Sequence, residues 1–209
     1  MNSEAKNILE KTLRDNPALA ACTGDIMKAF DILSGCYANG GMALICGNGG
    51  SAADSEHIVG ELMKGFMKKR PLPVEHKRML EDENLYGKMQ GALPAISLVS
   101  QTSIATAYSN DVAPDMAFAQ QVYGYRGKNN VLIGITTSGN SRNIVNAVRV
   151  ANAFGMKSIG LTGRDGGMLN GLCSAVIKVP AEETYRVQEF HLPVYHALCA
   201  MLEAEFFEI

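Results

Sequence analysis

The sequence predicts an α/β fold, a three-layer α/β/α sandwich with a five-stranded parallel sheet between helices. Two observations carry this prediction: five short apolar runs, and helical patterns that separate them. Almost continuously apolar runs are typical of strands covered on both faces, and strand–helix alternation favours a parallel sheet with right-handed crossovers. The predicted strands are Met42–Cys46, Ala95–Val99, Val131–Ile135, Lys157–Leu161 and Ala175–Val179.

The first 40 residues are predicted to form two helices ahead of the sheet. A break falls near Asp15-Asn16-Pro17, and the second helix ends at Asn39-Gly40-Gly41, where glycine favours a helix C-cap. These helices and the last one exceed what the sheet needs as cover. We therefore expect their apolar stripes to lie between subunits of an oligomer.

The remaining helices follow the strands in order. Between the strands they are predicted at Ser51 to about Lys69, Thr102–Tyr108, Pro114–Tyr123, Asn143–Phe154 and Gly166–Leu172. The last helix runs from about Glu183 to Phe207 and contains Pro193, which removes one helical hydrogen bond and is expected to kink it. The charged segment 72–91 is interpreted as an insertion, with a short helix over residues 75–85, in a single domain spanning 1–209.

Composition limits the possible functions. The 209 residues are 47% hydrophobic with a formal net charge of −2, so a buried core is expected and a basic field for nucleic acid or anionic membrane is not. The basic cluster Lys68-Lys69-Arg70 is interpreted as a solvated helix end. An N-terminus without a basic, then apolar stretch predicts no signal peptide. Five cysteines without a C-x-x-C pair favour a reducing cytoplasm and a place in the core.

The segment Thr136-Thr137-Ser138-Gly139-Asn140-Ser141 is the most informative part of the chain. It follows an apolar strand and precedes a helix, so backbone N–H groups and hydroxyls face the space above the turn. A phosphate fits there through neutral hydrogen bonds, because the six residues include no lysine or arginine. An ordinary N-cap with a tight turn is the alternative.

A second loop of the same design follows the first strand, at Gly47-Asn48-Gly49-Gly50-Ser51. Consecutive glycines let a ligand approach the backbone. The loop matches neither the P-loop nor the G-x-G-x-x-G pattern, so no nucleotide cofactor is expected. Two such loops predict one phosphorylated ligand at the carboxyl ends of parallel strands, although a tight structural turn would also explain each loop alone.

Ionisable side chains on two helices are candidates for chemistry. His57 and Glu61 are four residues apart on the first crossover helix and share a face, while Gln188 and His196 lie on the last helix. Imidazole and carboxylate together can move protons or bind Zn²⁺. A surface His–Glu pair and a half-buried histidine are the structural alternatives. His76 and His191 have no supporting context and are interpreted as surface or structural residues.

Taken in order, these segments resemble the phosphoheptose isomerase branch of the sugar isomerase (SIS) domain family. The matching stretches are CGNGGSAAD at Cys46–Asp54, His57 with Glu61, Asn110-Asp111, ITTSGNS ending at Ser141, LTGRDGG at Leu161–Gly167, RVQEFH at Arg186–His191, and His196. They cover nearly the whole chain apart from residues 72–91, a segment that is not expected in the standard enzyme. The family fold is a five-stranded parallel sheet between helices, and members are commonly homotetramers with active sites between subunits.

The resemblance implies a sugar-phosphate isomerase that interconverts sedoheptulose 7-phosphate and D-glycero-D-manno-heptose 7-phosphate through an enediol. It implies Glu61 as the base and His196 as the acid. It places the phosphate on Thr136, Thr137, Ser138 and Ser141, and the sugar on Asn48, Gly49, Gly50, Ser51, Asn110, Asp111 and Gln188. Some members bind zinc at positions matching His57, Glu61, Gln188 and His196.

Two other functions remain open at this point. One branch of the family is non-catalytic and binds the bacterial replication initiator, but it characteristically lacks the glutamate and the final histidine that stand here as Glu61 and His196. An isomerase of another sugar phosphate is the second, because the 72–91 segment follows the catalytic helix and could change the sugar accepted.

Overall fold

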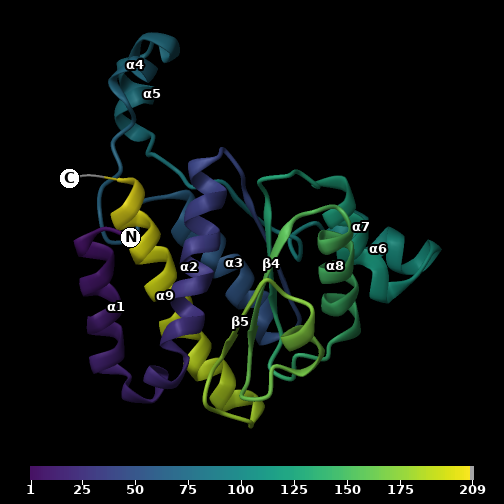
Figure 1. Cartoon of the computed structure of the whole chain (residues 1–209). Helices are drawn as coiled ribbons and strands as arrows, with labels where there is room; N and C mark the ends of the chain where they lie inside the picture. The colour runs from purple at the N-terminus through teal and green to yellow at the C-terminus, as the bar shows by residue number, and fades with distance from the viewer. Residues whose placement is uncertain (208–209) are drawn as a thin grey trace.

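A computed structural model describes residues 1–207 of the chain. Its parallel sheet lies between two groups of helices, as predicted (Figure 1). The strands are β1 (Ala43–Gly47), β2 (Ala95–Ser97), β3 (Val131–Ile135), β4 (Lys157–Thr162) and β5 (Ala175–Lys178). The helices are α1 (Ser3–Asp15), α2 (Thr23–Ala38), α3 (Gly50–Met63), α4 (Val74–Leu80), α5 (Glu83–Lys88), α6 (Thr102–Asp111), α7 (Ala117–Gly124), α8 (Arg142–Ala153) and α9 (Thr184–Phe206), with 3-10 helices at Pro17–Cys22, Pro114–Met116 and Gly167–Gly171.

The strand order β2-β1-β3-β4-β5 brings the two polar loops side by side. In register, Gly47 at the end of β1 pairs with Ile135 at the end of β3. The loops after both strands therefore leave the same edge of the sheet next to each other. This is the strand-order reversal point at which open parallel sheets bind ligands.

Each face of the sheet has its own apolar core. On one face, α2, α3 and α9 pack against the strands, with α1 on the outside of α9 (Figure 1). On the other face, α7 and α8 cover the sheet with a second cluster that includes Phe118, Val122, Ile144 and Val148. The cores explain why all five residues of β1 and of β3 are buried.

The extra helices bury their apolar stripes within the chain, which differs from the expectation that subunits would cover them. Ala5 and Leu9 of α1 are buried in the same core as α9, and α9 buries residues from Val187 to Ala204. The sheet's own helices thus leave room for α2 and α9 on one face. The apolar character of these helices does not require a partner subunit.

The 72–91 segment forms an arm that stands away from the body (Figure 1). It holds two short helices, α4 and α5, rather than one, and within the described residues neither buries a side chain. Two hydrogen bonds close its neck: the Gly91 N–H donates to the Arg70 carbonyl at 2.7 Å, and the Tyr86 hydroxyl donates to the Leu72 carbonyl at 2.9 Å.

The basic cluster before the arm is not a solvated helix end. Helix α3 stops at Met63, not near Lys69, because Lys64 turns to an extended conformation. Arg70 is fully buried, and its Nε donates to Glu203 Oε1 of α9 at 2.7 Å. The same carboxylate accepts the backbone N–H groups of Phe66, Met67 and Lys68. This buried pair fixes the segment between α3 and the arm onto the last helix.

Cys22, Cys36, Cys46 and Cys199 are buried, as predicted for core residues, whereas Cys173 is half-buried; all five are free thiols. In the last helix, α9 continues through Pro193 from Thr184 to Phe206 as a single helix. Among the residues described, no helix has the length and apolar content needed to cross a bilayer.

Candidate active site

The two loops form one polar hollow at the carboxyl edge of the sheet. Most of the residues expected to bind substrate line it; the lining comprises Asn48, Gly49, Gly50, Ser51, Ile135, Thr136, Thr137, Ser141, Thr184 and Gln188. Since β1 and β3 are neighbours, segments almost 90 residues apart in the sequence face each other here. The hollow holds no charged side chain, in keeping with a neutral phosphate site.

Side-chain hydrogen bonds join the two loops. The side-chain amides of Asn48 and Asn143 form two reciprocal hydrogen bonds of 3.0 and 2.8 Å, which link the first loop to helix α8. Within the second loop, the Thr136 and Ser141 hydroxyls are 2.8 Å apart. These bonds hold the loops in place without a ligand, so a phosphate would meet donors that are already arranged.

Two glycines are required by close approach. A Cβ on Gly50 would lie 2.3 Å from Nε2 of Gln188, so the glycine lets α9 bring this amide against the first loop. Gly139 has a φ of +68°, and a Cβ there would lie 2.1 Å from the Gly166 carbonyl oxygen. The glycines thus allow the loops and the last helix to converge on the hollow.

Ser138 lines a neighbouring hollow rather than the main one. That second hollow also includes Thr137, Asn140, Arg164, Asp165 and Glu182, with an Arg164–Glu182 ion pair of 2.6 Å. The Ser138 hydroxyl accepts the Asn140 N–H at 3.2 Å. Thr137 lines both hollows, so Ser138 lies at the boundary between them.

The ionisable candidates form a cluster where α3 meets α9. His57 Nε2 is 3.3 Å from Glu61 Oε1 and 3.5 Å from His196 Nε2. Glu61 is only 13% exposed, and its second carboxylate oxygen accepts the Lys64 ammonium at 3.1 Å. The His196 ring also packs beside Phe66, with ring centroids 5.4 Å apart. The packing of two helices therefore joins residues that are 139 positions apart.

Burial sets the electrostatics of this cluster. It lowers the pKa of His196 below its ordinary value, an effect that the neighbouring His57 increases and Glu61 opposes. The lowered pKa favours the uncharged imidazole form of His196 relative to an exposed histidine. A neutral histidine beside a carboxylate can pass a proton in either direction, which is the chemistry needed for acid–base catalysis.

Comparisons with known proteins agree with this geometry. The family model described as "SIS domain" matches residues 5–163. Phosphoheptose isomerase of Campylobacter jejuni serotype O:6 is 36% identical over 204 residues, covering 96% of this chain and 99% of that protein. Phosphoheptose isomerase of Burkholderia pseudomallei strain 1710b is 37% identical, covering 98% and 92%. The chain belongs to the phosphoheptose isomerase branch of the SIS domain family.

Solved structures of this branch have the same fold. The phosphoheptose isomerase of Francisella tularensis superposes with a TM-score of 0.76 at 30% identity, covering 98% of this chain and 100% of that one. The enzyme of Neisseria gonorrhoeae gives 0.74 at 32% identity, covering 93% and 94%. The α/β/α sandwich predicted from the apolar runs and the SIS domain implied by the motif resemblance are therefore both confirmed.

Asn110 and Asp111 lie apart from the other SIS motif residues. They end helix α6, are exposed to solvent, and bond to each other through the Asn110 amide and the Asp111 carboxylate at 2.8 Å. Neither belongs to the lining of the two hollows. A role in contacting the sugar would need a movement of α6, or a neighbouring molecule that brings substrate to this face.

The zinc ligands expected from the resemblance come together only in part. His57 is paired with Glu61 and with His196 at separations close to the roughly 3.3 Å between ligand atoms of a tetrahedral zinc site. The fourth, Gln188, lies against Gly50 in the hollow. Within residues 1–207, no three His, Cys, Asp or Glu side chains are arranged to hold a metal ion. The donors have suitable chemistry, but the full set does not form a metal site in this arrangement.

Sequence reasoning missed several residues of the site. The Tyr195 hydroxyl donates to Asp54 and also lies 3.0 Å from His57 Nδ1, and Lys64 pairs with Glu61. Thr184 lines the hollow, and Asn143 bonds the side chain of Asn48, which also lines it. The Lys64–Glu61 pair has i,i+3 spacing, which is a signal that the sequence does offer. The contacts of Tyr195 with α3 and of Asn143 with the first loop join segments far apart in the sequence, which the sequence does not reveal.

Proposed function

We propose that the protein interconverts sedoheptulose 7-phosphate and D-glycero-D-manno-heptose 7-phosphate, an aldose–ketose isomerisation. Membership of the phosphoheptose isomerase branch over nearly the full chain supports this substrate. The observation that carries the chemistry is the contact of the partly buried Glu61 with His57 beside His196, on helices that also border the phosphate hollow. The replication-initiator branch characteristically lacks both Glu61 and His196.

Glu61 is the proposed base. Its carboxylate takes a proton from C1 of the open-chain ketose, and the C1–H electron pair becomes the C1=C2 bond. The C2 carbonyl oxygen receives a proton from His196, which gives the enediol. In the second half, His196 takes a proton back from the C1 hydroxyl as C1=O forms, and the C1=C2 electron pair takes up at C2 the proton that Glu61 returns. No electrons are gained or lost, and both residues regain their initial states.

The neutral hollow is the proposed phosphate site. Hydroxyls of Thr136, Thr137 and Ser141 and the N-terminus of α8 supply donors, Ser138 adds a hydroxyl from the boundary with the neighbouring hollow, and Gln188 and the first loop are directed to the sugar. Gln188 and His196 are eight residues apart on α9, a rise of roughly 12 Å. An extended seven-carbon phosphate reaches from one to the other, with C1 and C2 at the cluster.

Isomerase activity on several substrates tests the proposal. The protein is incubated with sedoheptulose 7-phosphate and, separately, with six-carbon ketose phosphates, and aldose formation is followed by NMR. We expect turnover of the seven-carbon substrate in preference. Turnover of a six-carbon phosphate alone would assign another substrate, and no turnover of any sugar phosphate would favour a binding protein.

Zinc and a homotetramer are further parts of the proposal, both taken from the family resemblance. Elemental analysis of the purified protein, beside Glu61→Gln and His196→Asn, is expected to show zinc that both substitutions reduce. Light scattering at micromolar concentration is expected to give a tetramer. A metal-free, active wild type would remove zinc from the proposal, and an active monomer would remove the tetramer.

A further inference from the structure

The stretch Leu161–Gly167 matches a family motif but takes no part in the proposed reaction. Its first two residues end β4, and residues 163–167 form a loop that leaves the carboxyl edge of the sheet beside the Thr136–Ser141 loop. Thr162, the last residue of β4, also pairs with β5, the strand that leads into α9. The 163–167 loop therefore lies between two segments that line the phosphate hollow, the Thr136–Ser141 loop and the start of α9.

Two consecutive backbone N–H groups join the 163–167 loop to both neighbours. The Gly163 N–H donates to the Thr137 carbonyl at 3.0 Å, and the Arg164 N–H donates to the Ala181 carbonyl at 3.0 Å. Thr137 lines the phosphate hollow, and Ala181 comes shortly before Thr184, the first residue of α9. The loop thus links the donors proposed for the phosphate to the beginning of the last helix.

Gly163 leaves no room for a side chain at this junction. A Cβ there would lie 2.8 Å from the Thr137 carbonyl oxygen, 2.9 Å from the Ala181 carbonyl oxygen and 3.0 Å from Cγ2 of Val187. These atoms belong to the Thr136–Ser141 loop, to the approach to α9 and to the helix itself. Val187 is fully buried and directly precedes Gln188. The three segments can therefore come this close only because residue 163 is glycine.

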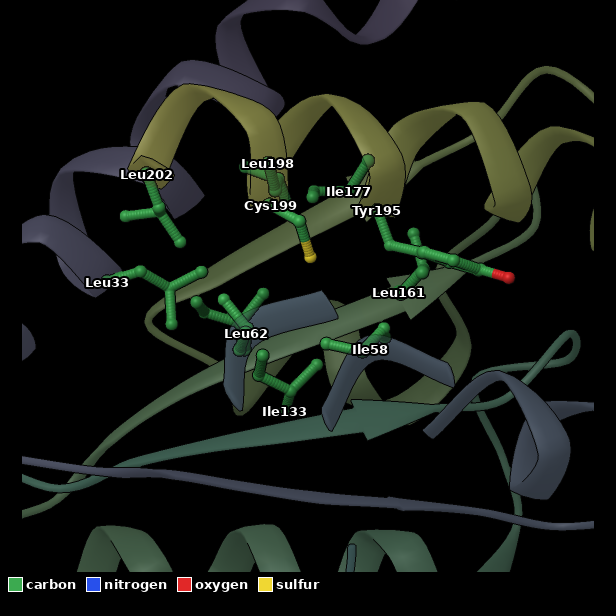
Figure 2. A pocket seen from close by; sticks show the side chains of 11 residues that line it. Leu33, Ile58, Leu62, Ile133, Leu161, Ile177, Tyr195, Leu198, Cys199 and Leu202 are labelled. Carbon is green, nitrogen blue, oxygen red and sulfur yellow. The ribbon is translucent and has the colours of Figure 1, made fainter. Parts of the chain in front are cut away.

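The first turns of α9 depend on this junction more than the rest of the helix does. Among the described residues, the side chain of the N-cap residue Glu183 makes no capping bond, and Pro193 has no N–H to donate to the carbonyl of Glu189. Figure 2 shows that apolar side chains fix the helix farther along: Leu198, Cys199 and Leu202 of α9 face Ile133, Leu161 and Ile177 of the sheet. The core therefore holds the turns near His196, whereas the turn that carries Gln188 relies on the loop.

We propose that Gly163 is a positioning residue and that the 163–167 loop holds Gln188 at a fixed spacing from the phosphate donors. This inference rests on the proposed function, in which the hollow binds the phosphate and Gln188 binds the sugar. A side chain at position 163 forces the Thr136–Ser141 loop and the first turns of α9 apart. The loop keeps the 2.8 Å contact between its Thr136 and Ser141 hydroxyls, so it still binds a phosphate. A ligand that must reach both the loop and Gln188 binds less tightly.

Gly163→Ala tests the inference with the smallest possible side chain. Gly171→Ala is the matched control, because Gly171 lies in the same connection between β4 and β5, and a Cβ there would meet no other segment within 4 Å among the described residues. Chemical denaturation shows whether each variant is folded.

The first readout is the ¹H–¹⁵N NMR signal of the Gln188 side-chain amide in the protein without substrate, identified by its loss in Gln188→Leu. We expect Gly163→Ala to shift this signal and Gly171→Ala to leave it at the wild-type position. An unshifted signal in folded Gly163→Ala would overturn the inference. The measurement does not depend on whether the protein is an isomerase.

The second readout compares two ligands by calorimetric titration. One is inorganic phosphate, and the other is the seven-carbon alditol phosphate obtained by reducing sedoheptulose 7-phosphate, which cannot isomerise. Gly163→Ala should bind inorganic phosphate like the wild type but bind the alditol phosphate about 3- to 10-fold more weakly, the effect of one neutral hydrogen bond. Equal losses for the two ligands, or no loss, would contradict the positioning role. A wild type that does not bind the alditol phosphate would instead refute the proposed function.

The exposed Arg164–Glu182 ion pair of 2.6 Å gives a second test, which applies even if Gly163→Ala does not fold. Arg164→Glu should shift the Gln188 signal and raise KM for sedoheptulose 7-phosphate by about two- to fivefold, the range for an exposed pair. Its kcat should stay near the wild-type value, because the core holds His196 in place. The double substitution of Arg164→Glu with Glu182→Arg restores the pair and should reverse both changes. A folded Arg164→Glu variant with the wild-type signal and KM, or a double variant that restores neither, would refute the role of the loop.

Discussion

The hollow and the ionisable cluster are built in opposite ways. The hollow consists of backbone, hydroxyl and amide groups contributed by two loops at the edge of the sheet, and it is free of charge. The cluster consists of two imidazoles and a carboxylate from the interior of two helices. This difference suggests that the two regions have different roles. The local turns bind the substrate phosphate, whereas the packing of two distant helices brings together the groups that transfer protons.

Glu61→Gln should have the largest effect of the variants, because it should lower proton transfer while leaving phosphate binding unchanged. Glutamine nearly matches the shape of glutamate but cannot take up the C1 proton, so kcat should fall by roughly 10²–10⁴-fold. Affinity for a non-reacting phosphate analogue should remain, because the hollow is unchanged. Glu56→Gln is the control, since Glu56 lies on the same helix and bonds only the Ser100 hydroxyl. Near-normal turnover by Glu61→Gln would remove it as the base.

His196→Asn extends the same test from the base to the acid. It removes the ring that is proposed to protonate the C2 oxygen, so kcat should also fall. Measured single and double substitutions show whether Glu61 and His196 act as a unit, in which case their effects do not add.

The buried Arg70–Glu203 ion pair lies behind the ionisable cluster and should contribute most to the stability of this region. Glu203→Gln leaves the Arg70 guanidinium buried without its counter-charge, and breaking such a pair costs about 3–5 kcal/mol of unfolding free energy. Because Glu203 also holds the backbone from Phe66 to Lys68, turnover should fall in the variant that remains folded. Chemical denaturation measures the first effect. An unchanged denaturation midpoint would show that the pair contributes little.

Hydroxyl removal tests the hollow. Ser138→Ala with Ser141→Ala should weaken binding of a substrate analogue, since each hydrogen bond lost to a charged phosphate is worth about 1.5–3 kcal/mol. The single variants distinguish the two hollows, because Ser141 lines the first and Ser138 the second. Calorimetric titration gives the affinities. If the double variant binds as tightly as the wild type, the phosphate lies elsewhere.

His191 lies between the two regions on α9 and gives the smallest effect. It is fully buried, neither ring nitrogen has a hydrogen-bond partner among the described residues, and burial lowers its pKa to about 4, against some opposition from the Thr162 backbone. An unfolded histidine protonates near pH 6.5, so between pH 6.5 and 4 the unfolded state binds more protons. The free energy of unfolding should therefore decrease as the pH falls, by at most about 1.4 kcal/mol per pH unit.

Denaturation of His191→Leu across this pH range checks the effect. The variant should lose this part of the pH slope, whereas His76→Gln on the arm should keep it. Equal slopes in wild type and His191→Leu would show that another group causes any acid sensitivity.

The sequence predicted the hollow more fully than the cluster. Strand β3 and the loop after it follow local rules, and both were placed within a residue of their observed bounds. The i,i+4 spacing predicts that His57 and Glu61 share a face, but the contact of His57 with His196 depends on how α3 and α9 pack, which the spacing does not give. Their place in catalysis stays a prediction.

Long-range pairing explains the larger errors. Arg70 looked like a surface residue because its partner, Glu203, is 133 positions away. Helix α3 ends at Met63, six residues before the predicted end near Lys69, for the same reason. The Glu203 carboxylate accepts the backbone N–H groups that would otherwise continue the helix. Tyr195 belongs to none of the matching motifs, and Asp54, which ends the first of them, has no role that the motif alone reveals. Such residues become visible only when the fold brings them together.

The neck of the arm has a practical consequence. Trypsin should cut first at Lys77, Arg78 or Lys88, which stand on short helices without buried side chains. Every cut there falls after Arg70 and before β2, so the earlier fragment keeps β1 and the later fragment keeps the other four strands and Glu203. The two fragments should stay associated through this bond and the shared core. A nicked, co-purifying pair would make the arm a natural place to split the chain or to insert a reporter.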